Sequence, residues 1–410
     1  MATSSHTHQA FSYPEIYLAI DNCFASKRFT EPADWMKVIR DLGIFHIEAS
    51  ADTECDPLYH GRDYLAGWVE KVKRASSKTG VSVCNLYSGH GTYATLGLSH
   101  TDSLIRNRIL DDWLKPMIQT AAQLGAGLGF YCHAFDNIVL QKPALYQNYK
   151  IDLISKLAEI ARFSDQEGCK TVGIEQMYSP HQIPWTIKGA KELLNQVAGK
   201  SQKPFYITID TGHQSGQSNF LKPTPEMILH AMEQYRYDLQ IGNLWLGPDS
   251  SYELFEKCDK MDQNHLSKLV DTILEDSSEY PYLFAEVSDC STYLWLEELA
   301  CYSPIIHLQQ TDGKSSLHLP FTQTYNQTGR IEGTKIIEAI SKSYENPSTL
   351  NLPKVDCIYL TIEVFASTAS INYLTLKDLR ETVRYWRQFV PKDGMKLNEL
   401  IKLSNAESIR

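Results

Sequence analysis

The stretch Ile207-Thr-Ile-Asp-Thr-Gly-His213 joins a run of strand-forming residues to a carboxylate and an imidazole. Its β-branched residues predict a buried strand that ends at Asp210, with His213 three residues later. Three other apolar runs carry an ionisable residue near their ends: Val172-Gly-Ile-Glu175, Pro304-Ile-Ile-His-Leu308 with His307, and Leu360-Thr-Ile-Glu363. Such a pattern indicates a sheet that gathers polar groups along one edge.

Eight short apolar or β-branched runs alternate with helical patterns along the chain. The runs are 16–20, 44–48, 81–86, 128–132, 171–175, 205–210, 305–308 and 357–363. Strands separated by helices pair in parallel, because parallel neighbours need crossover connections. Eight such units predict an α/β fold of the closed (β/α)8, or TIM-barrel, type. No GxGxxG follows the first run, which disfavours an open dinucleotide-binding sheet.

Two of the helical patterns carry clear end signals. Over 102–124, Asp102 is the expected N-cap, and Pro116 predicts a kink in the helix. The apolar face expected there begins with Leu104 and Ile105 and continues to Ala121. A second helix has Ile151, Ile154 and Leu157 on one face and ends at Gly168.

The connection between the sixth and seventh strands is much longer than the others. It contains a helix opened by Thr224-Pro225-Glu226 and a second helical stretch over 252–275. We interpret residues 214–303 as an insertion on the active-site face of one barrel domain that spans 15–410. Residues 1–14 lack the charged and apolar regions of a secretion signal and are expected to be a flexible leader.

Composition excludes several classes of function. The 410 residues include 39 Lys and Arg against 49 Asp and Glu, a net charge of −10, which argues against binding to nucleic acid. No run of about 18 apolar residues is present, so no membrane span is expected. Nine cysteines are scattered singly, as in a cytoplasmic protein with reduced thiols.

Carboxylates that end neighbouring parallel strands meet at the mouth of a barrel. Glu175, Asp210 and Glu363 would repel one another there and would be costly to desolvate without a cation. Three oxygen donors and the imidazole of His307 suit a divalent ion, with Mn²⁺ preferred and Mg²⁺, Co²⁺ or Zn²⁺ as alternatives. For any one of these residues, a salt bridge or a hydrogen-bonded core acid is the competing interpretation.

This set of residues resembles the xylose isomerase-like barrel superfamily, which includes sugar isomerases and epimerases and the class-II AP endonucleases. The family pattern is a Glu on strand five, Asp-x-x-His on strand six, a His on strand seven and a Glu on strand eight. The resemblance covers roughly 16–390, and Asp-Thr-Gly-His at 210–213 is its most specific part. Residues 22–28 and 302–313 further resemble barrels of erythrulose-phosphate catabolism.

The resemblance implies a metal-dependent isomerase or epimerase of carbohydrate metabolism, acting on a small ketose or ketose phosphate. Glu175 and Glu363 would face each other across the substrate, one removing a proton to form an enediolate and the other returning it. Return to the same carbon gives epimerisation, and return to its neighbour gives aldose–ketose isomerisation. His213 would bind a substrate oxygen.

The chain departs from the ketose epimerases at two positions. His181 stands where some members keep a Glu, and Gly313 with Lys314 stands where some keep an Arg. Together with Lys27 and Arg28, Lys314 raises the hypothesis of a phosphorylated substrate, because phosphate is bound by Lys and Arg. Solvated loop charges are the alternative. His90 and His133 follow the third and fourth strands and are further candidates for the substrate pocket.

Other functions remain open from the sequence. The same metal site could serve a dehydratase or decarboxylase of a keto-polyol or keto acid, or the barrel could bind a metabolite without turnover. An AP endonuclease is disfavoured because it needs further ligands for three zinc ions and a basic groove for DNA. The expected partners are a small sugar or sugar phosphate and a second copy of the chain in a homo-oligomer.

Overall fold

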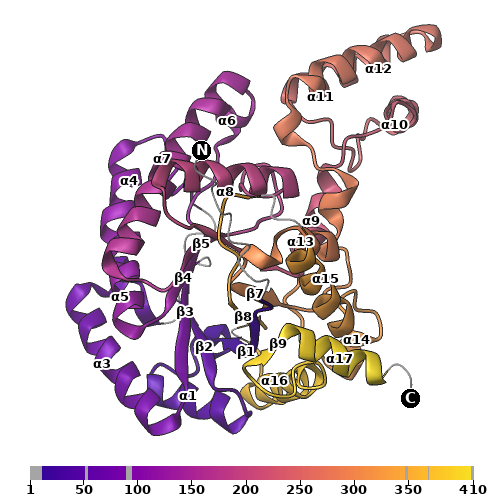
Figure 1. Cartoon of the computed structure of the whole chain (residues 1–410). Helices are drawn as coiled ribbons and strands as arrows, with labels where there is room; N and C mark the ends of the chain where they lie inside the picture. The colour runs from indigo at the N-terminus through magenta and orange to yellow at the C-terminus, as the bar shows by residue number, and fades with distance from the viewer. Residues whose placement is uncertain (1–11, 51–53, 89–94, 347–349, 368, 408–410) are drawn as a thin grey trace, which may run out of the picture.

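The computed structural model describes residues 12–50, 54–88, 95–346, 350–367 and 369–407 (Figure 1). Eight parallel strands form a closed barrel with helices around it, which confirms the predicted fold class. The barrel strands are β1 (Glu15–Asp21), β2 (His46–Ser50), β3 (Ser82–Ser88), β4 (Gly127–Phe130), β5 (Val172–Glu175), β6 (Tyr206–Asp210), β7 (Ile305–Leu308) and β8 (Cys357–Ile362). Pairing of β1 with both β8 and β2 closes the barrel. The short strand β9 (Met395–Lys396) adds antiparallel to the beginning of β1.

The barrel strands are buried on both faces, because side chains fill the interior and helices cover the outside. Pairing also fixes the relative height of the strand ends. Asp210 is opposite His307 in the β6–β7 pair, and His307 is opposite Thr361 in the β7–β8 pair. The carboxyl ends of the last strands therefore lie level with one another.

Helices follow the strands and pack side by side around the barrel. The outer helices are α1 (Pro32–Asp41), α3 (Arg62–Thr79), α5 (Lys115–Leu124), α7 (Pro143–Glu167), α8 (Ile187–Ser201), α13 (Thr292–Leu299), α15 (Gly333–Glu345) and α16 (Asn372–Trp386). The C-terminal helix α17 (Leu397–Glu407) packs on α15. Four shorter helices are α2 (Pro57–His60), α4 (Ser103–Arg108), α6 (Asn137–Leu140) and α14 (Gln323–Asn326). No helix in the described part of the chain is both long enough and apolar enough to cross a membrane.

The helix predicted over 102–124 is interrupted in its middle. Asp102 caps α4 through the Leu104 amide, as expected. A π-helical segment, Ile109–Leu114, then separates α4 from α5, and Pro116 lies in the first turn of α5. Proline has no N–H to donate to the preceding turn, so the regular hydrogen-bond ladder cannot run through this point.

Three residues expected on buried helix faces are exposed. Leu104, Ile105 and Ile151 keep 74%, 40% and 60% of their surface accessible. For Leu104 and Ile105, the wider π-helical turn changes the phase of the apolar stripe, so one period of 3.6 residues cannot describe both α4 and α5. Ile151 lies on α7 between Tyr146 and Leu153, which are both buried, but is not itself on the buried face of the helix.

The long β6–β7 connection contains α9 (Gln214–Gln217), α10 (Pro225–Asp238), α11 (Asp249–Phe255) and α12 (Gln263–Ser278) before α13. Thr224 caps α10 through the Met227 amide, as its sequence predicted. The helices α10, α11 and α12 project from the barrel (Figure 1), and we call them the arm. They have their own hydrophobic cluster, which includes Ile228, Phe255 and Leu266. In contrast, α13 packs between α8 and α15 as the sixth outer helix, although it lies within the predicted insertion.

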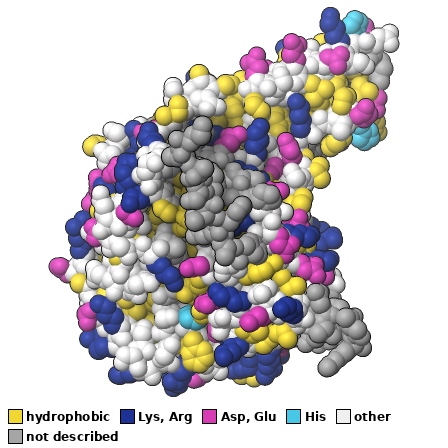
Figure 2. Space-filling view, viewed as in Figure 1, with side chains coloured by type: hydrophobic (Ala, Val, Ile, Leu, Met, Phe, Trp, Pro, Cys, Tyr) yellow, Lys and Arg dark blue, Asp and Glu magenta, His cyan; other side chains and the backbone are white. Residues whose placement is uncertain are grey.

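The molecular surface has charges of both signs. On the face seen in Figure 2, Lys and Arg side chains are interspersed with Asp and Glu over the barrel, and hydrophobic side chains are visible along the arm.

Candidate metal and substrate site

The four predicted metal ligands meet at the carboxyl ends of neighbouring strands. Glu175 ends β5, Asp210 ends β6, His307 lies in β7, and Glu363 directly follows β8. All four are buried, and one ligand atom of each lies within 4.8 Å of the others. Ionised groups buried at these positions need hydrogen bonds, charge partners or a bound cation to offset their desolvation.

His307 has a carboxylate at each ring nitrogen. Its Nδ1 lies 3.0 Å from Oε1 of Glu175 and 3.4 Å from Oε2 of Glu363, while its Nε2 lies 2.8 Å from Oε2 of Glu48. Burial alone would lower the pKa of His307, but the charges of Glu363 and Glu48 and the hydrogen bond to Glu175 raise it well above its usual value. Glu48 is held in turn by the Asn85 side chain, whose Nδ2 donates to Oε1 over 2.6 Å.

Asp210 uses its two carboxylate oxygens differently. Oδ1 accepts hydrogen bonds from the backbone of Gly212 (2.6 Å) and His213 (3.1 Å) and from Nε2 of Gln309 (2.7 Å). Oδ2 is buried and has no hydrogen-bond donor among the described residues. Burial would raise the pKa of Asp210, but the nearby imidazoles of His213, His318 and His307 lower it.

The two glutamates proposed as acid and base have different surroundings. Burial raises the pKa of Glu363 well above its usual value, and the carboxylates of Asp210 and Glu175 add to this effect against the opposing influence of His307. Burial also acts to raise the pKa of Glu175, but the hydrogen bond with His307 and the charge of His213 outweigh it and lower this pKa. The Tyr87 hydroxyl donates a hydrogen bond to Oε2 of Glu175.

These features fit a divalent cation. The donor set is three carboxylates and one imidazole, and a buried oxygen of Asp210 has no donor in the described part of the chain. The contact of Glu48 with Nε2 of His307 would turn Nδ1 toward such an ion, an arrangement common in metal sites. Glu175, Asp210, Glu363 and Nδ1 of His307 are therefore the groups that would hold it.

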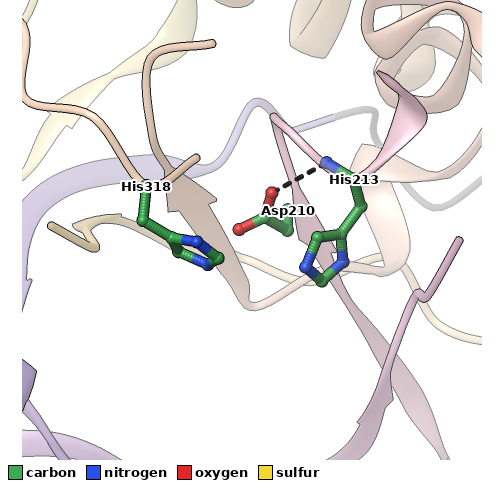
Figure 3. Close-up of side chains that lie close together, drawn as sticks. All are labelled: Asp210, His213 and His318. Carbon is green, nitrogen blue, oxygen red and sulfur yellow. Dashed lines mark hydrogen bonds between the residues drawn. The ribbon is translucent and has the colours of Figure 1, made fainter. Parts of the chain in front are cut away.

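A cavity of about 220 Å³ opens beside this cluster. Glu175, Glu363 and His213 line it together with Tyr87, Tyr131, Met177, Tyr178, Ser316, His318 and Phe365. Asp210 lies between the rings of His213 and His318 (Figure 3), and these three side chains also bring ligand atoms within 4.8 Å of one another. The His213 ring is fixed by a 2.7 Å hydrogen bond between Nδ1 and the Gln176 carbonyl oxygen. A larger groove, outside the barrel between α7, α8 and α13, contains none of these residues.

Two of the histidines predicted to bind substrate, His181 and His133, do not line this cavity. The His181 Nδ1 pairs with the Phe135 carbonyl oxygen at 2.7 Å. His133 is fully buried, and its Nε2 hydrogen-bonds the Ile183 carbonyl. Burial lowers the pKa of His133 to about 4. His90 lies outside the described residues.

The three predicted phosphate-binding cations lie on loops. Lys27 and Lys314 are exposed. The Arg28 guanidinium donates to the backbone carbonyls of Ser26, Ser367 and Ser370, which ties the β1 loop to the β8 loop. None of the three lines the 220 Å³ cavity.

Several residues at the site were missed by sequence reasoning. Glu48 ends the predicted apolar run 44–48, although it lies in the middle of β2, and Asp21 ends β1 beside it. The acid at the end of an apolar run, the signal used for Glu175, could have found both. Gln309, His318 and Phe365 had no such signal, because they follow the strands in irregular segments.

An eight-stranded barrel with a buried cluster of acids and imidazole at its mouth defines the class of protein. The family model of the xylose isomerase-like TIM barrel matches residues 36–244, slightly more than half of the chain. The chain therefore belongs to the xylose isomerase-like TIM barrel family. Comparison with curated proteins gives no match.

Solved structures of similar fold cover nearly the whole chain. A candidate xylose isomerase from Rhodospirillum rubrum ATCC 11170 has a TM-score of 0.64 at 15% identity, over 91% of this chain and 98% of that one. An L-ribulose 3-epimerase has a TM-score of 0.52 at 13% identity, over 96% and 97%. A D-tagatose 3-epimerase-like protein has a TM-score of 0.52 at 11% identity, over 96% and 99%. At these identities the likeness establishes a shared fold.

Proposed function

We propose that this protein is a divalent-metal-dependent isomerase or epimerase of a small ketose or ketose phosphate. The observation that carries the proposal is the convergence of Glu175, Asp210, His307 and Glu363 beside a cavity of sugar size. Mn²⁺ is the proposed ion. The expectations of a cytoplasmic protein and of a homo-oligomer stay predictions.

The cavity can hold a polyhydroxylated substrate between polar and aromatic walls. Tyr87, Tyr131, Tyr178 and Phe365 offer rings for the C–H faces of a sugar, and His213 offers an imidazole nitrogen for a hydroxyl group. Because Nδ1 of His213 is paired with a backbone carbonyl, Nε2 is the nitrogen available for the substrate.

The two glutamates carry out different steps of the proton transfer. When bound, the cation would polarise the substrate carbonyl and so acidify the adjacent C–H bond. Glu175, whose orientation is fixed by Tyr87 and His307, removes the proton, and Glu363 returns a proton in the forward direction. In the reverse direction the two carboxyl groups exchange roles. The face and carbon at which the proton returns decide between epimerisation and isomerisation.

The test is solvent deuterium exchange, followed by proton NMR in D₂O. The protein is stripped of metal, reloaded with Mn²⁺ for turnover and quenched with chelator before the spectra are recorded. The substrates are ketoses of four to six carbons, each tested with and without a terminal phosphate. Both forms are tested because the cations predicted to bind phosphate do not line the cavity, so the structure does not favour the phosphorylated form. Glu175→Gln and Glu363→Gln are the test variants, and Glu253→Gln, an exposed acid on α11, is the matched control.

We expect metal-dependent exchange at a carbon next to the carbonyl of at least one ketose. Both active-site variants should lose at least 100-fold in rate, in the range of general acid–base catalysis, while the control keeps the wild-type rate. Exchange that is unaffected by metal removal, or full activity in both glutamine variants, would refute the proposal.

A further inference from the structure

The loop that follows β7, residues 310–319, is closed at its base by backbone hydrogen bonds and is hydrogen-bonded to the site. Gln310 and Leu319 exchange two backbone hydrogen bonds, of 2.9 and 3.2 Å, which close the loop at its base. Inside it, the His318 amide donates to Oε1 of Gln309 over 2.6 Å. The same Gln309 side chain donates through Nε2 to Asp210, so one amide group joins the loop to a candidate metal ligand.

This arrangement turns the His318 ring into the cavity. The ring stacks on Phe365 with a centroid distance of 3.9 Å and an interplanar angle of 4°. Its Nε2 lies 3.5 Å from Oε2 of Glu363, longer than the roughly 2.8 Å of a strong charge-assisted hydrogen bond. The imidazole is therefore held in orientation by stacking and is not committed to the carboxylate.

The backbone of His318 is also strained. Its φ of +49° lies in the left-handed region, which is unfavourable for a residue with a Cβ. A glycine at position 318 would remove this cost. Earlier in the same loop, Asp312 and Gly313 form a turn in which a glycine does take a positive φ, +83° at Gly313. Strained non-glycine residues persist where the surroundings fix them, and they cluster at ligand-binding sites.

We infer that His318 is a substrate-binding residue that sets specificity, which rests on the proposed function above. Its imidazole hydrogen-bonds a hydroxyl group that lies beyond the carbonyl and its neighbouring carbons, while Phe365 supports the ring from behind. The substrate class is then a ketose with at least four carbons. Lys314, on the same loop, is exposed and does not line the cavity, so His318 is the residue that this loop contributes to substrate binding.

The experiment measures binding, so that it does not depend on turnover. Dissociation constants are determined by NMR titration of the Mg²⁺-loaded protein with two probes, L-ribulose and dihydroxyacetone. Dihydroxyacetone has hydroxyl groups only next to its carbonyl, whereas L-ribulose has two more beyond them. The variants are His318→Ala, His318→Gln, which keeps a hydrogen-bonding side chain, and Leu317→Ala, a 43% exposed neighbour that serves as the control.

His318→Ala should weaken L-ribulose binding by about threefold to tenfold, the value of one hydrogen bond, and leave dihydroxyacetone binding unchanged. His318→Gln should lose less, and Leu317→Ala should behave as the wild type. The inference is overturned if His318→Ala affects both probes equally or neither, if the wild type binds no L-ribulose, or if the variant loses its bound Mg²⁺, which would make His318 a metal ligand. Selective binding without any deuterium exchange would refute the proposed reaction and leave the role of His318 standing.

Discussion

Glu48 orients the imidazole of His307 from outside the predicted set of metal ligands. Its carboxylate accepts from Asn85 on one oxygen and contacts Nε2 of His307 with the other. In Glu48→Gln, one of these acceptors becomes an NH₂ donor, so one of the two contacts is lost. We expect divalent metal affinity to fall by about 10- to 100-fold, as for other residues that support a metal ligand.

The measurement for Glu48→Gln is a Mn²⁺ titration against a competing chelator, with Glu253→Gln as the control. A thermal melt of the metal-free protein shows whether the variant still folds. Unchanged affinity in a folded Glu48→Gln protein would mean that His307 does not need this partner to bind metal.

His133 predicts a pH dependence of stability. Because burial lowers its pKa from 6.5 to about 4, the imidazole is neutral in the folded protein. Below pH 6.5 the unfolded chain binds a proton that the folded chain does not, so stability is lost as the pH falls toward 4 and is fully present above 6.5. The expected contribution is about 2 kcal/mol between pH 7 and pH 5.

His133→Gln isolates this contribution, since glutamine keeps a donor for the Ile183 carbonyl and does not titrate. Urea unfolding at pH 7 and pH 5 should show a smaller loss of stability in the variant than in the wild type. Equal losses would mean that His133 titrates alike in both states.

At the scale of single residues, the sequence identified groups whose position is dictated by a strand. Glu175, Asp210 and Glu363 come at the ends of apolar runs, and the strands carry them to one place. The positions of Lys27, Arg28 and Lys314 near strand ends did not reveal where long side chains on loops would point. His318 could not be found, because its approach depends on the hydrogen bond from its amide to the Gln309 side chain and on the stacking with Phe365.

Among the elements, β5 and β6 must approach closely to align Glu175 with Asp210. A Cβ at Gly173 would lie 2.7 Å from the backbone oxygen of Tyr206, inside any allowed contact. Gly173→Ala should therefore push β5 away from β6, destabilise the fold by about 1–3 kcal/mol and weaken Mn²⁺ binding.

Gly199→Ala is the opposite case and the matched control. Gly199 lies in α8 with open space around it, so alanine should stabilise the protein by about 0.5–1 kcal/mol and leave metal binding unchanged. The free energies of unfolding and the Mn²⁺ affinities of both variants test the pair. A Gly173→Ala protein with wild-type affinity would show that the strand spacing at this point does not set the site.

The strands of this protein are easier to predict than the buried faces of its helices. A buried strand is read from one short apolar run, and each predicted run contains or overlaps one observed barrel strand. A helix face depends on a phase kept over many residues. The π-helical segment Ile109–Leu114 breaks that phase, so Leu104 and Ile105 were assigned to the wrong side.

For the whole molecule, the long β6–β7 connection separates into two parts with different partners. The helix α13 completes the outer ring of the barrel, whereas the arm packs around a cluster of its own. The spacing of the strands revealed the extra length, but not this division, because α10, α12 and α13 are all helices with apolar faces. One measurement of local stability can show whether the arm opens independently of the barrel.

Leu266 and Leu379 allow this test with the same substitution in each cluster. Both are fully buried, Leu266 in the arm and Leu379 in the main core on α16. Each leucine-to-alanine change should cost about 2–5 kcal/mol through lost burial and the cavity left behind. If the arm is an independent cooperative unit, Leu266→Ala accelerates amide hydrogen exchange in α10, α11 and α12 alone, while Leu379→Ala accelerates it in the barrel strands. Equal acceleration in β6 and β7 by Leu266→Ala would show instead that the arm and the barrel unfold together, because the loss of one cluster would then be transmitted to the strands that carry Asp210 and His307.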